Sequence, residues 1–370
     1  MVDSKYHNPV QVVQTSQWFT ACEEGMEQLG IKTPLILTSK GVLKYSKLDS
    51  VFPRNSIYSD ISSHPDFENC QLAMDFCRNN CYDGIIAIGG GSVMDTAKSV
   101  KAAIGLQCSD IKDILENTGK QFIKCIPSVF IPTTHGTGSE VTMWGTVWNM
   151  SEKKKYSISH PDLYPDLAIL DASLTLSLPL DISLITVLDA LSHGFEAVWN
   201  KNANQRSTEH AIEAICLILE NVFELKKDLN NIQVRKSLLN ASNKTGLAFS
   251  NTKTAAAHSI SYPLTAQFNI PHGIASSMAL LPLLKINKRE IENELKCILE
   301  KLELGDLSHL IKLIEKIPGN TIKYTLKDWG VSRSQLDEVA VQSFTKGRMD
   351  NNIIDLTEAQ VRFILEEIYS

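Results

Sequence analysis

Short apolar runs alternate with helix-length segments through the first half of the chain. Four runs rich in β-branched residues each end at turn-forming residues, and they lie at 35–37, 84–88, 128–131 and 167–170. Their apolar residues fall on both faces, which is typical of strands buried in a parallel sheet. Helical spacing fills segments between them, at 67–79 and 92–104. The alternation predicts a doubly wound α/β domain that binds ligands at the carboxyl ends of its strands.

After Pro179 the pattern changes to helical spacing alone. Helices are expected at 181–199, with Asp181 as the N-cap, and at 205–226, 231–249, 273–285, 287–302 and 305–316. Ser334 and Thr357 each begin a four-residue pattern typical of a capped helix start. We therefore expect an all-α second domain. The predicted division is an α/β domain at 1–178 and a helical domain at 179–370.

Composition and charge narrow the class of protein. The chain has 370 residues, of which 43% are hydrophobic and 21% charged, an ordinary globular mixture. Its net charge of −6 argues against a nucleic-acid binder. No apolar stretch is long enough to span a membrane, and the N-terminus lacks the apolar core of a secretory signal. The eight cysteines include no CxxC pair and are expected to be reduced. We expect a cytoplasmic protein that binds neither nucleic acid nor membrane.

A glycine-rich turn follows the second of the four apolar runs. Gly89, Gly90, Gly91 and Ser92 lie between that strand and a helical segment. Glycines let the backbone approach a ligand closely, and the helix N-terminus presents unpaired N–H groups, so the turn favours a pyrophosphate. A plain strand-to-helix turn is the alternative. A second polar turn at 132–140, after the next strand, supplies hydroxyls at the same sheet edge and favours a nucleotide site.

Four side chains in the helical half have the chemistry of metal ligands. Asp189 and His193 are four residues apart, so both project from one face of an apolar helix. A buried carboxylate is costly without a partner, and a divalent cation would remove that cost. For this pair alone, a simple Asp–His hydrogen bond is the better interpretation. His258 and His272, in small-residue surroundings, change the balance, because three imidazoles and one carboxylate suit a first-row divalent metal.

Taken together, the motifs resemble the iron-containing (group III) alcohol dehydrogenase family. They are Gly-Gly-Gly-Ser-x-x-Asp-x-x-Lys at 89–98, Pro-Thr-Thr-x-Gly-Thr-Gly-Ser-Glu at 132–140, Tyr-Pro-Asp-Leu-Ala-Ile-Leu-Asp at 164–171, Asp-Ala-Leu-Ser-His at 189–193, and His258 with Pro271-His272-Gly273. The resemblance is strongest from about 35 to 285. It implies a dehydroquinate synthase-like fold, with an N-terminal Rossmann-like α/β domain and a C-terminal helical domain.

The resemblance also implies roles for individual residues. Asp189, His193, His258 and His272 would bind one catalytic divalent metal, with Fe²⁺ favoured and Zn²⁺ also suited. The turn from Gly89 to Ser92 would hold the pyrophosphate of NAD or NADP. Other residues are implied at the cofactor, and they are Asp95, Thr133, Thr134, Leu178 and Lys155, the last matching a lysine after a small hairpin. The metal would polarise an aldehyde oxygen while the nicotinamide carries the hydride.

Three positions depart from the common family pattern. Tyr262 stands where many members have a histidine thought to relay protons, and it either donates a proton or fills space. His135 replaces a small residue, so it either reaches a polar or anionic substrate group or points to solvent. Ser39 stands where an acidic residue would repel a 2′-phosphate, and Lys40 follows it, so we expect NADPH to be tolerated.

Two segments are similar to the phosphonoacetaldehyde reductase branch of the family. They lie at 258–265 and 346–352. This similarity implies reduction of a short aldehyde that carries an anionic group, such as phosphonoacetaldehyde to 2-hydroxyethylphosphonate. His135, Lys346 and Arg348 are the candidate partners of the anion.

Other functions remain open at this point. The enzyme alternatives are a sulfoacetaldehyde or unsubstituted short-chain aldehyde reductase and, from another reaction class, a dehydroquinate-synthase-like lyase. The lyase is disfavoured because no Lys/Arg/Glu-rich set suited to a sugar phosphate lies between the metal motifs. A non-catalytic, assembly-forming relative would be expected to lose a ligand, and all four are present. A homodimer is the default expectation.

Overall fold

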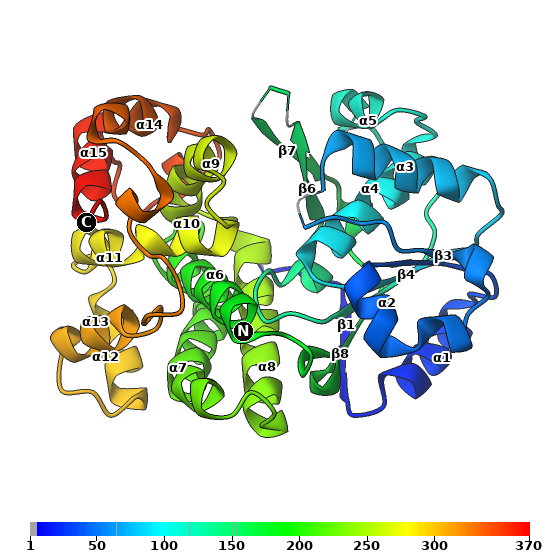
Figure 1. Cartoon of the computed structure of the whole chain (residues 1–370), viewed down its shortest axis with the longest axis horizontal. Coiled ribbons are helices and arrows are strands. Elements are labelled where there is room, and N and C mark those ends of the chain that lie inside the picture. The colour runs from blue at the N-terminus through cyan, green and yellow to red at the C-terminus, as the bar shows by residue number, and fades with distance from the viewer. Residues whose placement is uncertain (1–5, 64, 118, 150, 153) are drawn as a thin grey trace. The chain divides into compact units, whose positions relative to one another are not determined.

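The computed structural model describes residues 6–370 except 64, 118, 150 and 153, and it divides the chain into two compact units (Figure 1). The α/β unit comprises 8–134 and 138–177. The helical unit comprises 178–370 together with 135–137 and the described residues before Asn8. Between the main segments of the two units, the boundary lies between Ser177 and Leu178. Residues 135–137 group with the helical unit, which no feature of the sequence indicated.

The α/β unit is built on a six-stranded parallel sheet with strand order β1-β8-β5-β4-β2-β3. Its strands are β1 (Gln11–Thr15), β2 (Pro34–Thr38), β3 (Ile57–Tyr58), β4 (Gly84–Gly89), β5 (Ser128–Pro132) and β8 (Leu167–Asp171). The four central strands are those that the apolar runs predict. The two edge strands were missed, because β1 is half exposed and β3 has only two residues.

Alternate residues of the central strands face two separate apolar cores. Leu35 and Leu37 of β2 face one core, and Ile36 faces the other. The helices of this unit are α1 (Trp18–Leu29), α2 (Lys40–Ser46), α3 (Phe67–Arg78), α4 (Gly91–Leu106) and α5 (Ile111–Asn117). Residues of α3, α4 and α5 line the first core, and residues of α1 and α2 line the second. The sheet is therefore covered on both faces, as the alternation of strands and helices predicts.

A two-stranded antiparallel hairpin lies outside the main sheet. It consists of β6 (Trp144–Asn149) and β7 (Lys154–Ser159). Lys155, which the family resemblance implies to follow a small hairpin, instead belongs to the hairpin, because it is a residue of β7 and pairs with Trp148.

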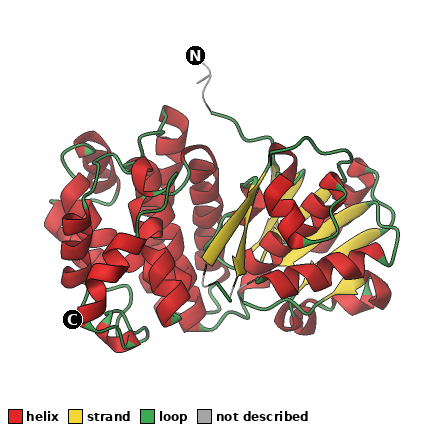
Figure 2. Cartoon of the chain, turned by 90° about the horizontal axis from the view of Figure 1, so that it is seen from above, coloured by secondary structure: helices red, strands yellow, loops and turns green. Residues whose placement is uncertain are grey.

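The helical unit contains ten helices among its described residues. They are α6 (Leu180–Val198), α7 (Gln205–Lys227), α8 (Ile232–Thr252), α9 (Ala256–Phe268), α10 (His272–Met278), α11 (Leu280–Asn287), α12 (Glu292–Lys301), α13 (Leu307–Glu315), α14 (Leu336–Gln342) and α15 (Glu358–Glu367). Figure 2 shows this part of the chain as helices and loops only. Helix α6 packs against α7, α8, α9 and α10, and it is buried almost throughout its second half. None of the described helices has the length and apolar character needed to cross a membrane.

The helices differ from the expectation in several places. Pro179, not Asp181, is the N-cap of α6, and Asp181 lies in its first turn. The single helix expected at 273–285 is divided at Ala279 into α10 and α11. Pro282 explains the break, because it has no N–H to bond the carbonyl four residues earlier. Helix α9, which carries His258, was not recognised, since it contains Pro263.

Candidate metal centre and dinucleotide site

Helix α6 presents three ionisable side chains on one buried face. Asp189, His193 and Glu196 follow the i, i+4, i+7 spacing of a helix face, and each is at most 5% exposed. Sequence reasoning identified the first two and missed Glu196. Its spacing of seven residues from Asp189 was the available signal.

Helices α9 and α10 bring two more imidazoles to this face. One ligand atom from each of Asp189, His258 and His272 lies within 4.8 Å of the others. Gly273 permits the close packing of α10, because a Cβ there would lie 2.2 Å from the carbonyl oxygen of Ile185 on α6. The three residues come from three helices, so tertiary packing alone assembles the group.

His193 lies beside this group without belonging to it. Its Nδ1 is 3.9 Å from Oδ2 of Asp189. Its ring stacks on that of His258, with centroids 4.2 Å apart. The geometry places His193 next to the three other candidate ligands, and its role as a fourth ligand stays a prediction.

Glu196 holds His258 at two points. Its Oε1 accepts the backbone N–H of His258 at 3.0 Å, and its Oε2 pairs with Nδ1 of the same residue. The Nε2 atom of His258 is thereby directed to the other side, where it lies 3.6 Å from Oδ1 of Asp189. Ser276 donates to that same Oδ1 at 3.1 Å. Such outer partners fix the orientation of a ligating imidazole.

The carboxylates and imidazoles of this group shift one another's pKa values. Burial alone would raise the pKa of Asp189, but the imidazoles of His193, His258 and His272 hold that pKa below its ordinary value. Burial would lower the pKa of His258, yet Glu196 and Asp189 raise it to about 10. Two buried carboxylates therefore require positive charge between them.

The donor set fits a divalent metal. A carboxylate oxygen and imidazole nitrogens are the ligands of catalytic zinc and non-haem iron sites. The site is buried, and Nε2 of His258 has no hydrogen-bond partner among the described residues. A bound cation would use this atom and neutralise the carboxylates.

Tyr262 and His135, the two residues predicted to act in proton transfer or substrate contact, lie in different surroundings. Tyr262 follows His258 by one turn of α9, and its ring centroid is 6.3 Å from that of His272. His135 is fully buried, and neither ring nitrogen has a hydrogen-bond partner in the described part of the chain. Burial, with a smaller effect of the Arg235 guanidinium, lowers the pKa of His135 to about 3. The alternative that His135 points to solvent is therefore wrong.

The loop of His135 is anchored to α6. Its neighbour Gly136 lies so close to Thr186 that a Cβ would be 2.9 Å from the Cβ of that residue. Thr186 precedes Asp189 by one helical turn. Arg235 ties down the same end of α6, because it donates to the hydroxyl of Ser183 at 2.8 Å and to the carbonyl of Leu178 at 3.1 Å.

The glycine turn of the α/β unit packs closely against the loop that follows β5. The backbone N–H of Thr133 donates to the carbonyl of Gly89 at 3.0 Å. A Cβ on Gly90 would lie 3.1 Å from Cγ2 of Thr134. The two predicted loops thus lie side by side at the carboxyl ends of β4 and β5. Gly91 begins α4, and the hydroxyl of Ser92 donates to the carbonyl of Ser63 at 2.8 Å.

Asp95 has protein partners for both carboxylate oxygens. Its Oδ1 accepts from the Ser139 hydroxyl at 2.9 Å, and its Oδ2 accepts from the Thr146 N–H at 3.0 Å. Buried Lys98 donates to the carbonyl and hydroxyl of Ser139, each at 2.8 Å. These contacts brace the loop that leads into β6. A cofactor contact by Asp95 stays a prediction.

The remaining residues predicted at the cofactor lie at separate places in the structure. The Nζ atom of Lys155 lies 5.9 Å from the ring centroid of Trp148. Leu178 belongs to the helical unit. Ser39 is the N-cap of α2, and its hydroxyl accepts the N–H of Val42 at 3.3 Å. Lys40 forms an ion pair with Asp60, with 2.6 Å between Nζ and Oδ1.

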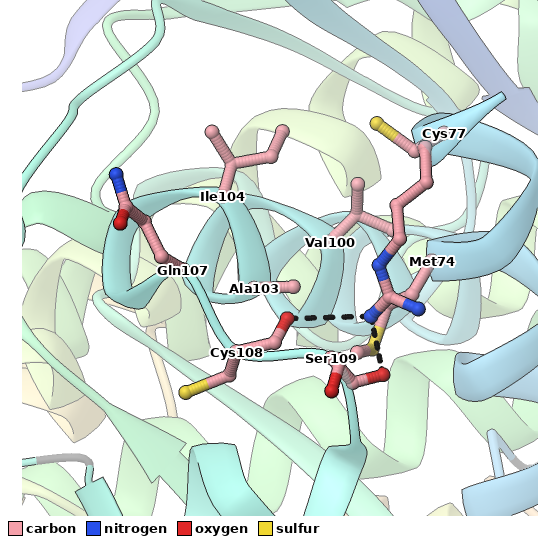
Figure 3. A pocket seen from close by; sticks show the side chains of 9 residues that line it. Met74, Cys77, Val100, Ala103, Ile104, Gln107, Cys108 and Ser109 are labelled. Carbon is pink, nitrogen blue, oxygen red and sulfur yellow. Dashed lines mark hydrogen bonds between the residues drawn. The ribbon is translucent and has the colours of Figure 1, made fainter. Parts of the chain in front are cut away.

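One cavity lies away from these turns, between α3 and the far end of α4. It is lined by Met74, Cys77, Arg78, Val100, Ala103, Ile104, Gln107, Cys108 and Ser109 (Figure 3). The Arg78 guanidinium donates to the carbonyls of Cys108 and Ser109 and pairs with Asp75. Ile104 at the cavity is twelve residues after Ser92, so the cavity lies roughly 18 Å along the helix from the glycine turn. The charge of Arg78 is already compensated by Asp75 and the two carbonyls, so we assign the cavity no ligand.

Comparison with known proteins agrees with this geometry. The family model "Iron-containing alcohol dehydrogenase" matches residues 9–172, and "Fe-containing alcohol dehydrogenase family, C-terminal" matches 183–369. Long-chain-alcohol dehydrogenase 1 of Geobacillus thermodenitrificans is 30% identical over 93% of this chain and 91% of its own length. Sulfoacetaldehyde reductase of Bilophila wadsworthia is 25% identical over 93% of this chain and 89% of its own length.

A solved structure gives the same result. The crystal structure of sulfoacetaldehyde reductase from Bifidobacterium kashiwanohense in complex with NAD⁺ superposes with a TM-score of 0.87 at 25% identity, covering 99% of this chain and 98% of that one. The fold and the matches define an oxidoreductase that acts on alcohols or aldehydes. The chain belongs to the iron-containing alcohol dehydrogenase family.

Proposed function

We propose that this chain is a metal-dependent and NAD(P)-dependent aldehyde reductase, and an alcohol dehydrogenase in the reverse direction, whose substrate is a short aldehyde with an anionic group. The observation that carries the proposal is the buried group of Asp189, His258 and His272, with ligand atoms within 4.8 Å of one another. Family membership supports the redox chemistry.

The residues of the helical unit would have two roles at the metal, to bind it and to orient a ligand. Asp189, His258 and His272 would hold the cation, with His193 as the fourth ligand. Glu196 engages Nδ1 of His258 and so leaves Nε2 on the side of Asp189, where the cation would bind. The donor set suits Fe²⁺ and Zn²⁺ alike, and the family description favours iron. When bound, the cation would supply Lewis-acid polarisation of the substrate oxygen, and the nicotinamide would supply the hydride.

The α/β unit would hold the dinucleotide at its glycine turn. The N–H groups at the start of α4 face the carboxyl edge of the sheet and suit a pyrophosphate. The hydroxyl of Thr134 lies beside this turn, 3.4 Å from where a Cβ on Gly90 would stand, and Thr133 bonds Gly89 through its backbone N–H. Tyr262 is the candidate donor of the proton that completes the alcohol, because it lies one turn after His258. We expect a homodimer.

The anionic group is supported by the segment that follows α14. The Ser259 hydroxyl donates to the carbonyl of Ser343 and accepts the N–H of Thr345 at 3.1 Å, so this segment is tied to α9 beside His258. Arg348, in the same segment, is half buried, bonds the Gly347 carbonyl, and forms no ion pair with the described residues. A guanidinium with free donors suits a phosphonate or a sulfonate.

A substrate panel tests the proposal. Purified protein with one divalent metal is given NADH or NADPH and phosphonoacetaldehyde, sulfoacetaldehyde, acetaldehyde and butanal, and loss of the reduced cofactor is followed by absorbance. We expect kcat/KM for an anionic aldehyde to exceed that for acetaldehyde at least tenfold, and Arg348→Met to remove most of this difference. Equal rates across the panel would refute the anionic substrate. No net oxidation of either cofactor would refute the reductase.

Sulfoacetaldehyde is the second candidate substrate, since two sulfoacetaldehyde reductases are among the similar proteins. The panel distinguishes it from phosphonoacetaldehyde by comparing kcat/KM for the two aldehydes, whose anionic groups differ in charge. A phosphonate gains a second negative charge near neutral pH, whereas a sulfonate keeps one.

A further inference from the structure

The structure places an acidic residue beside Ser39 that the sequence does not reveal. Strands β2 and β3 are paired in parallel, with Ile36 opposite Ile57 and Leu37 opposite Tyr58. Continued two residues beyond the paired segment, this register would set Ser39 opposite Asp60, and the ion pair between Lys40 and Asp60 shows that the two chain segments stay close there. Both residues then lie at the carboxyl edge of the sheet, where ligands of doubly wound folds bind.

Asp60 is also close to the glycine turn through its own chain. Three residues after it, the carbonyl of Ser63 accepts the hydroxyl of Ser92 at 2.8 Å. A three-residue span covers at most about 10 Å, so Asp60 lies within that distance of the segment contacting the start of α4. Strand β2 separates β3 from β4 in the sheet. A dinucleotide seated at the turn would therefore direct its adenosine ribose towards the ends of β2 and β3.

The charge of Asp60 is shared with Lys40. Nζ of Lys40 lies 2.6 Å from Oδ1 of Asp60, and the two side chains are 77% and 71% exposed. An exposed pair of this kind contributes little to stability and rearranges easily. Both side chains are thus accessible to a ligand that can compete with this ion pair. Asp60 would accept a ribose 2′-OH and repel a 2′-phosphate, while Lys40 would attract that phosphate.

We infer that Asp60, and not the residue at position 39, is the acidic determinant of coenzyme selectivity in this chain, and that Lys40 moderates it. This inference rests on the proposed function, because it requires a nicotinamide dinucleotide at the glycine turn. With Asp60 partly neutralised by Lys40, the chain would favour NADH and still tolerate NADPH. Removing either charge shifts the preference, and the two shifts have opposite signs.

Direct binding of the cofactors tests this without any turnover. The affinities of the full chain for NADH and for NADPH are measured by the change in nicotinamide fluorescence, and the selectivity is the ratio of the two Kd values. Asp60→Asn should shift the ratio towards NADPH by about fivefold to tenfold, since one exposed charge a few ångströms away has that order of effect. Lys40→Ala should shift the ratio towards NADH by a similar factor.

Two controls make the result specific. Glu224→Gln breaks another exposed pair, Lys227 with Glu224 at 2.6 Å on α7, and should leave the ratio unchanged. Raising the salt to 1 M should reduce both shifts, because the charges involved are exposed.

The outcomes separate the inference from the proposed function. If the wild-type chain binds neither cofactor, the proposed function fails and this inference with it. If the chain binds NADH or NADPH but the ratio moves less than twofold in both variants, or both variants shift it in the same direction, the inference alone is overturned.

Discussion

Glu196 is the residue whose replacement tests the architecture of the metal centre most sharply. Glu196→Gln keeps the side-chain volume and removes one negative charge from a fully buried position. The carboxylate makes two contacts with His258, one to the backbone N–H at 3.0 Å and one to Nδ1. The amide retains one acceptor, so it can keep only one of these contacts as an acceptor.

The contacts that the substitution removes determine the expected loss of metal affinity. Hydrogen bonds to charged groups contribute about 1.5–3 kcal/mol each. Loss of the contact to Nδ1 leaves the His258 ring free to turn or to change tautomer, and changes of this kind weaken metal binding about 10–100-fold. We therefore expect the Kd for Zn²⁺ or Fe²⁺ to rise by one to two orders of magnitude in Glu196→Gln.

The assay is competition for the metal against a chromophoric chelator, with circular dichroism to show that the variant is folded. Glu213→Gln is the matched control, because Glu213 is a half-exposed carboxylate on α7 that pairs with Lys244. Its metal affinity should equal that of the wild type. A folded Glu196→Gln variant with affinity within twofold of the wild type would refute the assigned orientation of His258.

Three further predictions concern packing, acid stability and proton transfer. Gly273→Ala should destabilise the fold by at least about 1–3 kcal/mol in urea titrations, because its Cβ would lie 2.2 Å from the Ile185 carbonyl oxygen, whereas Gly119→Ala, with nothing within 4 Å, should change stability little. The lowered pKa of His135, about 3 instead of 6.5, means that the unfolded chain binds more protons between those values. The free energy of unfolding should therefore decrease as the pH is lowered from 6.5, by up to about 1.4 kcal/mol per pH unit. The decrease should be steeper in the wild type than in His135→Leu, and parallel curves of stability against pH would contradict this. Tyr262→Phe should lower kcat at least about 100-fold with metal content unchanged if Tyr262 donates the proton, and a loss under threefold would leave it a packing role.

Much of the α/β unit was predictable because its central strands carry their own signal. The apolar run at 84–88 and the glycines after it are local features, and β4 and the start of α4 match them. The edge strands β1 and β3 lack this signal, because they face solvent or contain two residues. Asp60 was unrecognisable in the sequence for the same reason, since its place beside Ser39 depends on the pairing of β3.

The metal centre was predictable only in part from local spacing. Asp189 and His193 share a helix face, so a spacing of four residues identifies them. His258 and His272 come from separate helices, and their convergence depends on the packing of α10 against α6 at Gly273. The family motifs supplied that information. Glu196 was missed because a glutamate in a helix is usually exposed, and only the packing of α9 shows that this one is buried.

The same distinction applies to His135. Its departure from a small residue is visible in the sequence, but its burial is not. The grouping of 135–137 with the helical unit follows from contacts such as that of Gly136 with Thr186.

The central claim is that Asp189, His258 and His272 share one divalent cation, and metal stoichiometry tests it most directly. Wild-type protein and Asp189→Ala are dialysed to equilibrium against Fe²⁺ under anaerobic conditions, or against Zn²⁺, and bound metal is measured by elemental analysis. We predict one equivalent in the wild type and less than a tenth of an equivalent in the folded variant. A wild type that binds no metal, or a variant that keeps its full equivalent, would contradict the account.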